Sequence, residues 1–349
     1  MKIQETDQSR LSEINFDKLP FGEIFTDHML LCHYKDGAWK EPEIRPYGEL
    51  PFYPGLQALH YGQSIFEGMK AFKNEEDHIF LFRPEENYKR LNRSAVRMCM
   101  PELPKEVFMN GLEQLLRIDH KWIPKGEGKS LYIRPFMFAS GNFIIARPGK
   151  EYLFAIICCP TGSYYSGEVR VKIEENYARS GPGGTGFAKA AGNYAASFYP
   201  AKLAVEEGYS QLIWTDAATH THIEESGTMN IMFHIGDKLI TPNLSEKILA
   251  GITRDSVIKL AKHMNIVVEE RQVSVAEIID ALEKGTLKEA FGVGTAVTVS
   301  PISLIGKGNK KYELPKSTNS LAITLKNALE DIKKAKTADP FGWRKEIII

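Results

Sequence analysis

Four short stretches of the sequence crowd glycine and other small residues around a few reactive side chains. They are GPGGTGFAKAAGNY, IEESGTMN, ILAGITRDS and AFGVGTAVT. Glycine-rich loops beside Ser or Thr offer backbone N–H groups to a phosphate, and a helix that begins directly afterwards adds its positive end. Gly251-Ile252-Thr253 and Gly294-Thr295 fit this requirement. Ordinary turn glycines remain the simpler interpretation of any single stretch, and none matches the phosphate-loop pattern GxxxxGK[ST].

Lys189 is the candidate nucleophile in the first stretch. It lies within FAKAA, and its nearest charged neighbours in sequence are Arg179 and Lys202. An amine in apolar surroundings gives up its proton more easily and can then act as a nucleophile, although most single lysines are solvated surface charges. Glu225, beside Ser226 and Gly227, has two interpretations as well. Its carboxylate could cap a helix, or it could pair with a cationic ring nitrogen.

The composition favours a two-domain protein that acts on small molecules. A chain of 349 residues is longer than a single hydrophobic core usually supports, and two domains create a cleft. The 44 basic residues balance the 44 acidic ones, so no net field would draw the chain to nucleic acid or to an anionic membrane. The longest strongly apolar stretch, 153–159, is far shorter than a bilayer span.

The N-terminus and the cysteines predict a cytoplasmic protein. The N-terminal stretch MKIQETDQSRLSEINFDKL mixes charges and lacks an apolar core, so it resembles neither a secretory signal nor a transit peptide. Cys32, Cys99, Cys158 and Cys159 show no CxxC spacing, and the last two lie in the apolar run LFAIICCP, which favours reduced, buried thiols. The nine histidines show no HExxH or paired spacing, so we expect no metal.

These reactive residues must be positioned by a mixed α/β fold, because helical and strand patterns alternate without a fixed repeat. In the first half, HIFLF predicts a strand, and EENYKRLNRSAVRMCM predicts a helix with Pro84 in its first turn. The spacing of Phe108, Leu112 and Leu115 predicts a second helix. SLYIRPFMFAS and EYLFAIICC predict strands, and the second is apolar enough to be buried on both faces.

In the second half, QLIW, MNIMFHI and KLIT predict strands, and a helix is expected after Gly251. Ser274 and Glu277 form a capping box that opens a further helix, which Gly285 ends, and the last helix is expected over about 319–334. The turn-like composition of TGSYYSGEV marks the domain boundary. We therefore predict an N-terminal domain over 1–165, a linker over 166–172 and a C-terminal domain over 173–349.

Six motifs, in order along the chain, resemble the branched-chain aminotransferases of the class IV, fold-type IV pyridoxal-phosphate enzymes. They are LHYGQSIFEGMKAF, LFRPEENYKRLNRSAVRMCMP, SLYIRPFMF, KAAGNYAAS, EESGTMN and AFGVGTAVTVSP. The resemblance runs from about Phe21 to the end of the last helix. It implies a small α/β N-terminal domain and a larger C-terminal pseudo-barrel domain that binds pyridoxal 5'-phosphate.

The resemblance also implies roles for single residues in holding the cofactor. Lys189 matches the lysine that carries pyridoxal phosphate as a Schiff base and moves the substrate's proton. Glu225 matches the carboxylate that pairs with the pyridine nitrogen, and Tyr194 matches the phenol that hydrogen-bonds the ring oxygen. The other cofactor-binding positions implied by the family, most of them around the phosphate, are Arg83, Arg179, Thr228, Ile252, Thr253 and Thr295.

A mostly aromatic pocket would select the substrates. The matching positions are Phe21, Tyr61, Phe66, Tyr132, Tyr164, Thr228 and Ala296. An apolar wall of this kind suits leucine, isoleucine and valine, although each aromatic residue alone is equally a core residue. Arg134 matches the arginine that receives the distal carboxylate of glutamate or orients the pocket tyrosines. In this family the residue that matches Tyr61 reaches the pocket from the partner subunit, which implies a homodimer.

The implied reaction is ping-pong transfer of the amino group of L-leucine, L-isoleucine or L-valine to 2-oxoglutarate. The nearest alternatives are a D-amino acid transaminase and an aminodeoxychorismate lyase, which share the lysine, the glutamate and the phosphate site. A non-catalytic protein of the same fold is an alternative from another class. The preference among the three amino acids and the physiological direction of transfer stay open.

The sequence departs from some animal members of the family at one place. Those enzymes carry a CxxC redox switch after the GTA segment, where this chain has Val297 and Ser300. Thiol regulation at that position is therefore not expected.

Overall fold

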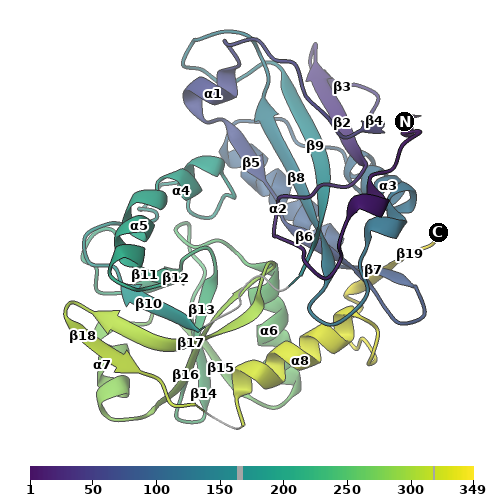
Figure 1. Cartoon of the computed structure of the whole chain (residues 1–349). Coiled ribbons are helices and arrows are strands. Elements are labelled where there is room, and N and C mark those ends of the chain that lie inside the picture. The colour runs from purple at the N-terminus through teal and green to yellow at the C-terminus, as the bar shows by residue number, and fades with distance from the viewer. Residues whose placement is uncertain (163–167, 317–318) are drawn as a thin grey trace. The chain divides into compact units, whose positions relative to one another are not determined.

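The computed structural model describes residues 1–162, 168–316 and 319–349, which form two compact units (Figure 1). Unit 1 comprises residues 1–164, 188–192 and 331–349, and unit 2 comprises residues 165–187 and 193–330. The first part of the predicted linker, 166–167, and the predicted pocket residue Tyr164 lie outside the described residues.

Two segments that the sequence analysis assigned to the C-terminal domain belong to unit 1. Residues 188–192 join it because Ala190 forms an antiparallel bridge with Ile65. Residues 331–349 join it because strand β19 (Arg344–Ile347) pairs with β7 (Ile79–Phe82). These pairings are between residues far apart in sequence, so turn composition and local periodicity gave no sign of them.

Unit 1 is built on a mixed sheet. Its described strands form a ten-stranded sheet with the order β1-β4-β2-β9-β8-β6-β7-β19, while β3 pairs with β2 and β5 pairs with β8. The antiparallel pair β8 and β9 lies at its centre, and β9 is buried along nearly all its length, as its apolar sequence predicts. The remaining bounds are β1 (Lys2–Ile3), β2 (His28–Lys35), β3 (Ala38–Trp39), β4 (Glu43–Pro46), β5 (Ser64–Phe66), β6 (Met69–Lys73), β8 (Ser130–Ala139) and β9 (Tyr152–Thr161).

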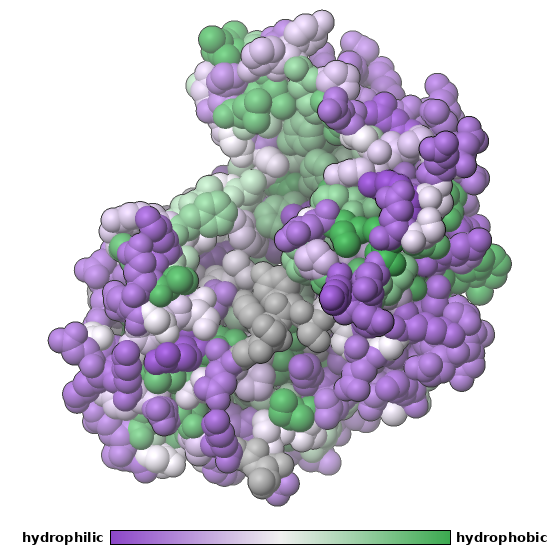
Figure 2. Space-filling model, viewed as in Figure 1, coloured by the Kyte–Doolittle hydropathy of each residue, from purple (hydrophilic) through white to green (hydrophobic). Residues whose placement is uncertain are grey.

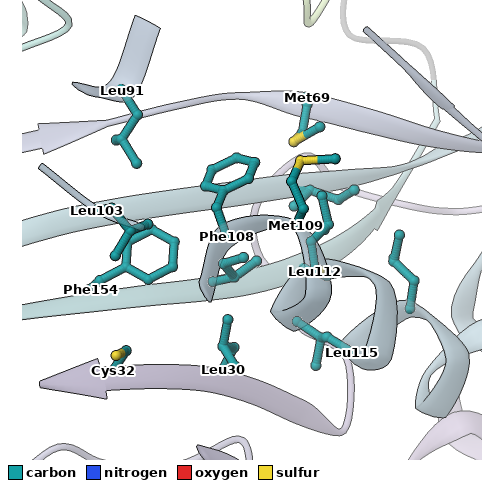
Figure 3. Packing of buried hydrophobic residues seen from close by; sticks show 14 of the residues in the cluster. Leu30, Cys32, Met69, Leu91, Leu103, Phe108, Met109, Leu112, Leu115 and Phe154 are labelled. Carbon is teal, nitrogen blue, oxygen red and sulfur yellow. The ribbon is translucent and has the colours of Figure 1, made fainter. Parts of the chain in front are cut away.

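Two long helices supply much of the core of unit 1. They are α2 (Pro84–Arg97), which has the predicted proline in its first turn, and α3 (Lys105–Ile118). Figure 3 shows Met109 of α3 pointing toward Met69 of β6, and the ring centroids of Phe108 of α3 and Phe154 of β9 lie 6.1 Å apart. A Cβ atom at Gly111 would come within 2.5 Å of the Leu30 side chain, so glycine allows this close approach of helix and strand. The shorter helices are α1 (Gln57–Tyr61) and two 3-10 turns (Leu11–Glu13 and His120–Trp122).

Unit 2 is built on a second mixed sheet, and the predicted strands QLIW, MNIMFHI and KLIT all belong to it. Its described strands form a nine-stranded sheet with the order β12-β11-β10-β17-β16-β13-β14-β15, while β18 pairs with β17. Their bounds are β10 (Val169–Ile173), β11 (Gln211–Thr215), β12 (Ile223–Ser226), β13 (Asn230–Ile235), β14 (Lys238–Pro242), β15 (Val267–Arg271), β16 (Leu287–Gly294), β17 (Thr298–Lys307) and β18 (Lys310–Glu313).

Three helices of the second half, after Gly251, after Ser274 and near the C-terminus, follow the sequence prediction, whereas α4 (Ala191–Ala195) and α5 (Phe198–Glu206) were not predicted. The Ser274 hydroxyl accepts the N–H of Glu277 at 3.0 Å, whereas the Glu277 carboxylate pairs with Arg271, so half of the capping box forms. Gly285 follows that helix with a φ of +67°. The helix bounds are α4 (Ala191–Ala195), α5 (Phe198–Glu206), α6 (Ile252–His263), α7 (Val275–Glu283) and α8 (Leu321–Lys333).

The helices of the described residues are short, and three of the four cysteines are buried. No helix among the described residues is both long and apolar enough to cross a bilayer. Cys32, Cys158 and Cys159 are buried free thiols, as expected, but Cys99 is exposed because it follows the end of α2. Burial raises the pKa of Cys32 to about 11, so that thiol stays protonated and unreactive near neutral pH.

Candidate active site

The backbone of Lys189 is fixed from both sides within unit 1. Its N–H donates to the Ser94 hydroxyl at 2.9 Å, and its carbonyl accepts the N–H of Phe66 at 3.0 Å. The next residue, Ala190, bridges to Ile65 at the end of the sheet. The lysine therefore lies on a short stretch of chain whose polar backbone groups are satisfied by β5 and α2, which limits where its side chain can point.

The Lys189 amine lies among the aromatic residues that the sequence assigned to a substrate pocket. Its Nζ is 4.8 Å from the ring centroid of Phe66, and the guanidinium carbon of Arg134 is 4.7 Å from the same centroid. Arg134 also donates to the Tyr132 hydroxyl at 3.1 Å, and the Phe21 ring meets the Tyr132 ring edge-on at 4.9 Å. Five predicted residues thus converge, and they offer an amine, a guanidinium and an apolar wall.

Gly68 is required for this arrangement. A Cβ atom at position 68 would collide with the hydroxyl of Tyr132, a buried side chain beside it. The absence of a side chain at Gly68 therefore leaves room for the phenol that Arg134 contacts.

A buried ion pair that sequence reasoning missed lies next to this group. Glu67 is fully buried, and its carboxylate accepts from Arg90 at 2.7 and 2.9 Å and from Asn87 at 2.7 Å. Burial alone would raise the pKa of the Glu67 carboxyl, but the Arg90 guanidinium and the positive charge of Lys189 hold this pKa below its usual value. The Ser94 hydroxyl that accepts from Lys189 donates in turn to the Arg90 carbonyl at 3.0 Å.

Signals for this pair were present in the sequence. Glu67 interrupts the apolar run SIFEGMKAF, and Arg90 recurs with Asn87 and Ser94 on the buried face of α2. A charged residue among core positions indicates a buried partner, although the sequence does not say which one.

In unit 2 the Glu225 carboxylate is buried and held by three donors. Arg179 Nε lies 2.7 Å from one oxygen, and the Leu249 N–H and the Asn230 amide donate to the other at 2.9 and 3.2 Å. Arg179 also donates to the carbonyls of Lys247 and Gly186 at 3.0 and 3.1 Å. An ionised carboxylate in this setting can accept from a cationic ring nitrogen. The sequence analysis placed Arg179 near a phosphate, whereas the structure places its guanidinium on Glu225.

The first turn of α6 lies beside the Glu225 carboxylate. Asn230, which donates to Glu225, also donates to the Leu249 carbonyl at 2.9 Å, and a Cβ atom at Gly251 would collide with the Asn230 side-chain oxygen. The N-cap is thus a glycine with no side chain to cover the helix N-terminus, and Ile252 and Thr253 begin the helix, as predicted. A carboxylate and a helix N-terminus joined through one asparagine suit a ring that carries a basic nitrogen and a phosphate.

The other predicted residues occupy turns and element ends. Tyr194 lies in α4, Thr228 lies in the turn between β12 and β13, and Thr295 and Ala296 lie in the turn between β16 and β17. In unit 1, Tyr61 ends α1 and Arg83 immediately precedes α2.

Comparisons with known proteins agree with this chemistry. A family model described as amino-transferase class IV matches residues 64–305. Branched-chain-amino-acid aminotransferase 2 of Bacillus subtilis (strain 168) is 44% identical over 336 residues, which are 95% of this chain and 93% of that protein. The branched-chain aminotransferase of Thermoproteus uzoniensis, solved with norvaline, has a TM-score of 0.74 at 25% identity, covering 91% of this chain and 100% of its own. The branched-chain amino acid aminotransferase of Thermobaculum terrenum, solved in its PLP form, shares the fold, with a TM-score of 0.74 at 21% identity, covering 92% of this chain and 98% of its own.

Proposed function

This chain belongs to the class IV aminotransferases and, among them, to the branched-chain-amino-acid aminotransferases, and we propose on that basis that it carries out their reaction. It transfers the amino group of L-leucine, L-isoleucine or L-valine to 2-oxoglutarate and yields L-glutamate and the branched-chain 2-oxo acids. Pyridoxal 5'-phosphate is its cofactor. Because such a transfer is near equilibrium, the supply of substrates sets its direction.

The residues that hold the cofactor have separate tasks. Pyridoxal phosphate, when bound, carries the amino group between substrates and accepts the electrons released at the substrate Cα. Glu225, paired with Arg179, would hold the ring nitrogen in its protonated form. The backbone N–H groups at the start of α6 and the Thr253 hydroxyl would hold the phosphate, together with Arg83 and Thr295, while Tyr194 would donate to the ring oxygen.

Lys189 has the catalytic role in this proposal. Its amine would take the proton from the substrate Cα and deliver it to the C4′ carbon of the cofactor, and the opposite half-reaction would run this transfer in reverse, which requires a base held in one position. The bonds from Ser94 and Phe66 supply that constraint on the lysine backbone. The Phe66 ring beside the amine would help to keep water away from the proton that is being moved.

The observation that carries the substrate proposal is the group of Phe66, Tyr132, Phe21 and Arg134 around the Lys189 amine. Its rings suit an aliphatic side chain, and its guanidinium suits the second carboxylate of glutamate. Both substrates of a transaminase must use one site, so an apolar wall that also contains a cation matches the pair leucine and glutamate.

Steady-state rates test the proposed reaction directly. The full chain, loaded with pyridoxal phosphate, is assayed with L-leucine, L-isoleucine and L-valine against 2-oxoglutarate, and we expect glutamate to form with all three. D-Alanine and aminodeoxychorismate serve as comparison substrates. Turnover of either of these without turnover of L-leucine would replace the proposal with a D-amino acid transaminase or a lyase.

Ser94→Ala tests the constraint on Lys189. The change removes the acceptor of the Lys189 N–H, so we expect kcat to fall by about 10- to 100-fold, the size associated with a slightly misplaced catalytic group. We also expect unfolding in urea to show a loss of about 1–3 kcal/mol for the unsatisfied N–H. Thr324→Ala is the matched control, because it removes the same kind of helical hydroxyl-to-carbonyl bond in α8 and leaves both backbone bonds of Lys189 intact. Equal kcat values for the two variants would contradict the constraint.

We propose further that the chain forms a homodimer in which Tyr61 completes the partner's pocket. Tyr61 is 44% exposed at the end of α1, and Leu59 on the same helix is 74% exposed. Leu56 bridges to Asn142, which brings α1 next to the exposed Ile144 and Ile145. Figure 2 shows hydrophobic surface over the part of unit 1 that carries α1. A soluble monomer rarely exposes a contiguous apolar patch of this kind, so we expect a second copy of the chain to pack against it.

Mixing two inactive variants tests this dimer. Tyr61→Ala and Lys189→Ala chains are each expected to have low activity, and unfolding and refolding them together forms mixed dimers. One site of each mixed dimer then holds an intact Lys189 and the intact Tyr61 of the other chain, so activity should return. If sedimentation shows a dimer but activity does not recover, Tyr61 belongs to the pocket of its own chain. If sedimentation shows a monomer, the proposed dimer is disproved.

A cytoplasmic location is proposed as well, on the ground that all four cysteines are free thiols. Proteins of oxidising compartments usually pair their cysteines in disulfides.

A further inference from the structure

Arg83 holds a backbone conformation that is unusual for an arginine. It is the N-cap residue of α2, and its φ of 52° and ψ of 46° lie in the left-handed region. That region costs a residue with a side chain about 1–2 kcal/mol. Such strain persists where the surrounding structure imposes it, and it concentrates at functional sites. A glycine would relieve the strain but would remove the guanidinium.

The C-terminal segment imposes this conformation. The Arg83 N–H donates to the Trp343 carbonyl at 2.8 Å, immediately before β19 pairs with β7. The turn that precedes β19 is closed by Asp339, whose carboxylate accepts the N–H groups of Phe341 and Arg344 at 3.1 and 2.8 Å. Trp343 is therefore fixed on both sides, by a closed turn and by a strand.

The indole ring of Trp343 also limits the Arg83 side chain. The guanidinium carbon lies 5.4 Å from the ring centroid, within the range of a cation–π contact. The indole is buried, stacked on Phe341 with centroids 4.1 Å apart and an angle of 15°, and meets Phe82 edge-on at 5.6 Å. A ring held by two aromatic neighbours is a rigid surface, so the arginine that contacts it has fewer rotamers to occupy.

We propose that Trp343 is a positioning residue that presets Arg83 to bind the phosphate of the cofactor. The inference rests on the proposed role of Arg83, and it adds the reason why the Arg83 guanidinium is already oriented before the phosphate binds. A guanidinium recognises phosphate through a planar fork of N–H groups, so its orientation matters as much as its charge. Without Trp343 the side chain must be ordered when the phosphate binds, and that ordering weakens binding.

The effect of Trp343 on phosphate binding can be isolated by measuring the affinity of the cofactor-free full chain for two ligands. Pyridoxal phosphate contacts the phosphate site, whereas pyridoxal, which lacks the phosphate, reports on the lysine and the ring contacts alone. Trp343→Leu keeps apolar bulk and the backbone carbonyl but removes the aromatic face, and Trp343→Phe keeps that face. Dissociation constants are measured by equilibrium dialysis, and urea midpoints show that the variants are folded.

Trp343→Leu should weaken pyridoxal phosphate binding by about tenfold or more, the effect of degrading one charge-assisted contact to phosphate. Trp343→Phe should stay within about twofold of the parent chain, and neither variant should change pyridoxal binding by more than about twofold. In an Arg83→Ala chain, Trp343→Leu should produce no further loss, because the tryptophan acts through the arginine.

Four results would overturn the inference. Equal losses for pyridoxal and pyridoxal phosphate would show that Trp343 supports the fold in general. A full effect of Trp343→Leu in the Arg83→Ala chain would show that it does not act through Arg83. Unchanged affinity for pyridoxal phosphate in Arg83→Ala alone would disprove the proposed role of Arg83. A weaker affinity in Arg83→Ala, with an unchanged affinity in Trp343→Leu, would support the role of Arg83 and refute the role of Trp343.

Discussion

Lys189→Ala should abolish amino-group transfer. We expect kcat to fall by at least about 10⁴-fold, since in our proposal the change removes both the amine that bonds to the cofactor and the base that moves the Cα proton. The expected loss in stability is small, because the bonds of the Lys189 backbone to Ser94 and Phe66 do not involve its side chain. Single-turnover kinetics with L-leucine measure the effect on the proton transfer itself.

Two controls separate this result from a general loss of a charge. Lys202→Ala removes an exposed lysine of α5, and it should leave kcat within about twofold of the parent chain. Borohydride treatment of the loaded parent chain, followed by peptide mapping, should place the pyridoxyl group on Lys189. A pyridoxyl group on another lysine, or a Lys189→Ala chain with substantial turnover, would disprove the assignment.

Glu225→Gln has the second largest expected effect. The glutamine keeps the shape of the side chain but loses the charge that pairs with Arg179 and, in our proposal, with the cofactor nitrogen. We expect kcat to fall by about 10²–10³-fold, the usual cost of losing one preorganised electrostatic partner. The unfolding free energy should fall by about 3–5 kcal/mol, because Arg179 then stays buried without its counter-charge.

The adjacent residue gives a matched control. Glu224 is also buried, and its carboxylate lies 2.6 Å from Lys247 Nζ, but it points to the other face of strand β12. Glu224→Gln should cost stability while kcat stays close to that of the parent chain. If the two variants lost activity equally, Glu225 would have a structural role only.

The sequence was sufficient for the long helices, for strands such as β8 and β9 and, through the family resemblance, for the pocket group. The helix after Pro84, the capping serine at 274 and the glycine before α6 all depend on local physics, in which a proline, a hydroxyl or a missing side chain acts on neighbours a few residues away. The convergence of Phe66, Tyr132 and Arg134 on Lys189 was available only through family resemblance, since these residues lie on three separate segments.

The sequence was not sufficient for contacts that join distant segments. The partner of Glu67 is on a helix, the acceptor of the Lys189 N–H is on the same helix, and the residue against Arg83 lies 260 positions further along the chain, at Trp343. For the same reason the ion pair of Arg179 with Glu225 was not predicted. Periodicity and composition describe the surroundings of a residue, and they do not identify its partner.

The division of the chain into units limits how this enzyme can be rearranged. The chain passes between the units on either side of 188–192, so Lys189 lies on an excursion of five residues from unit 2 into unit 1. A fragment that spans 165–330 would carry the lysine without the strand and helix that fix it, and a fragment that ends at 164 would lack the lysine altogether. Neither half can be exchanged between proteins as an independent module, and a circular permutant is expected to function only if its new ends spare that excursion.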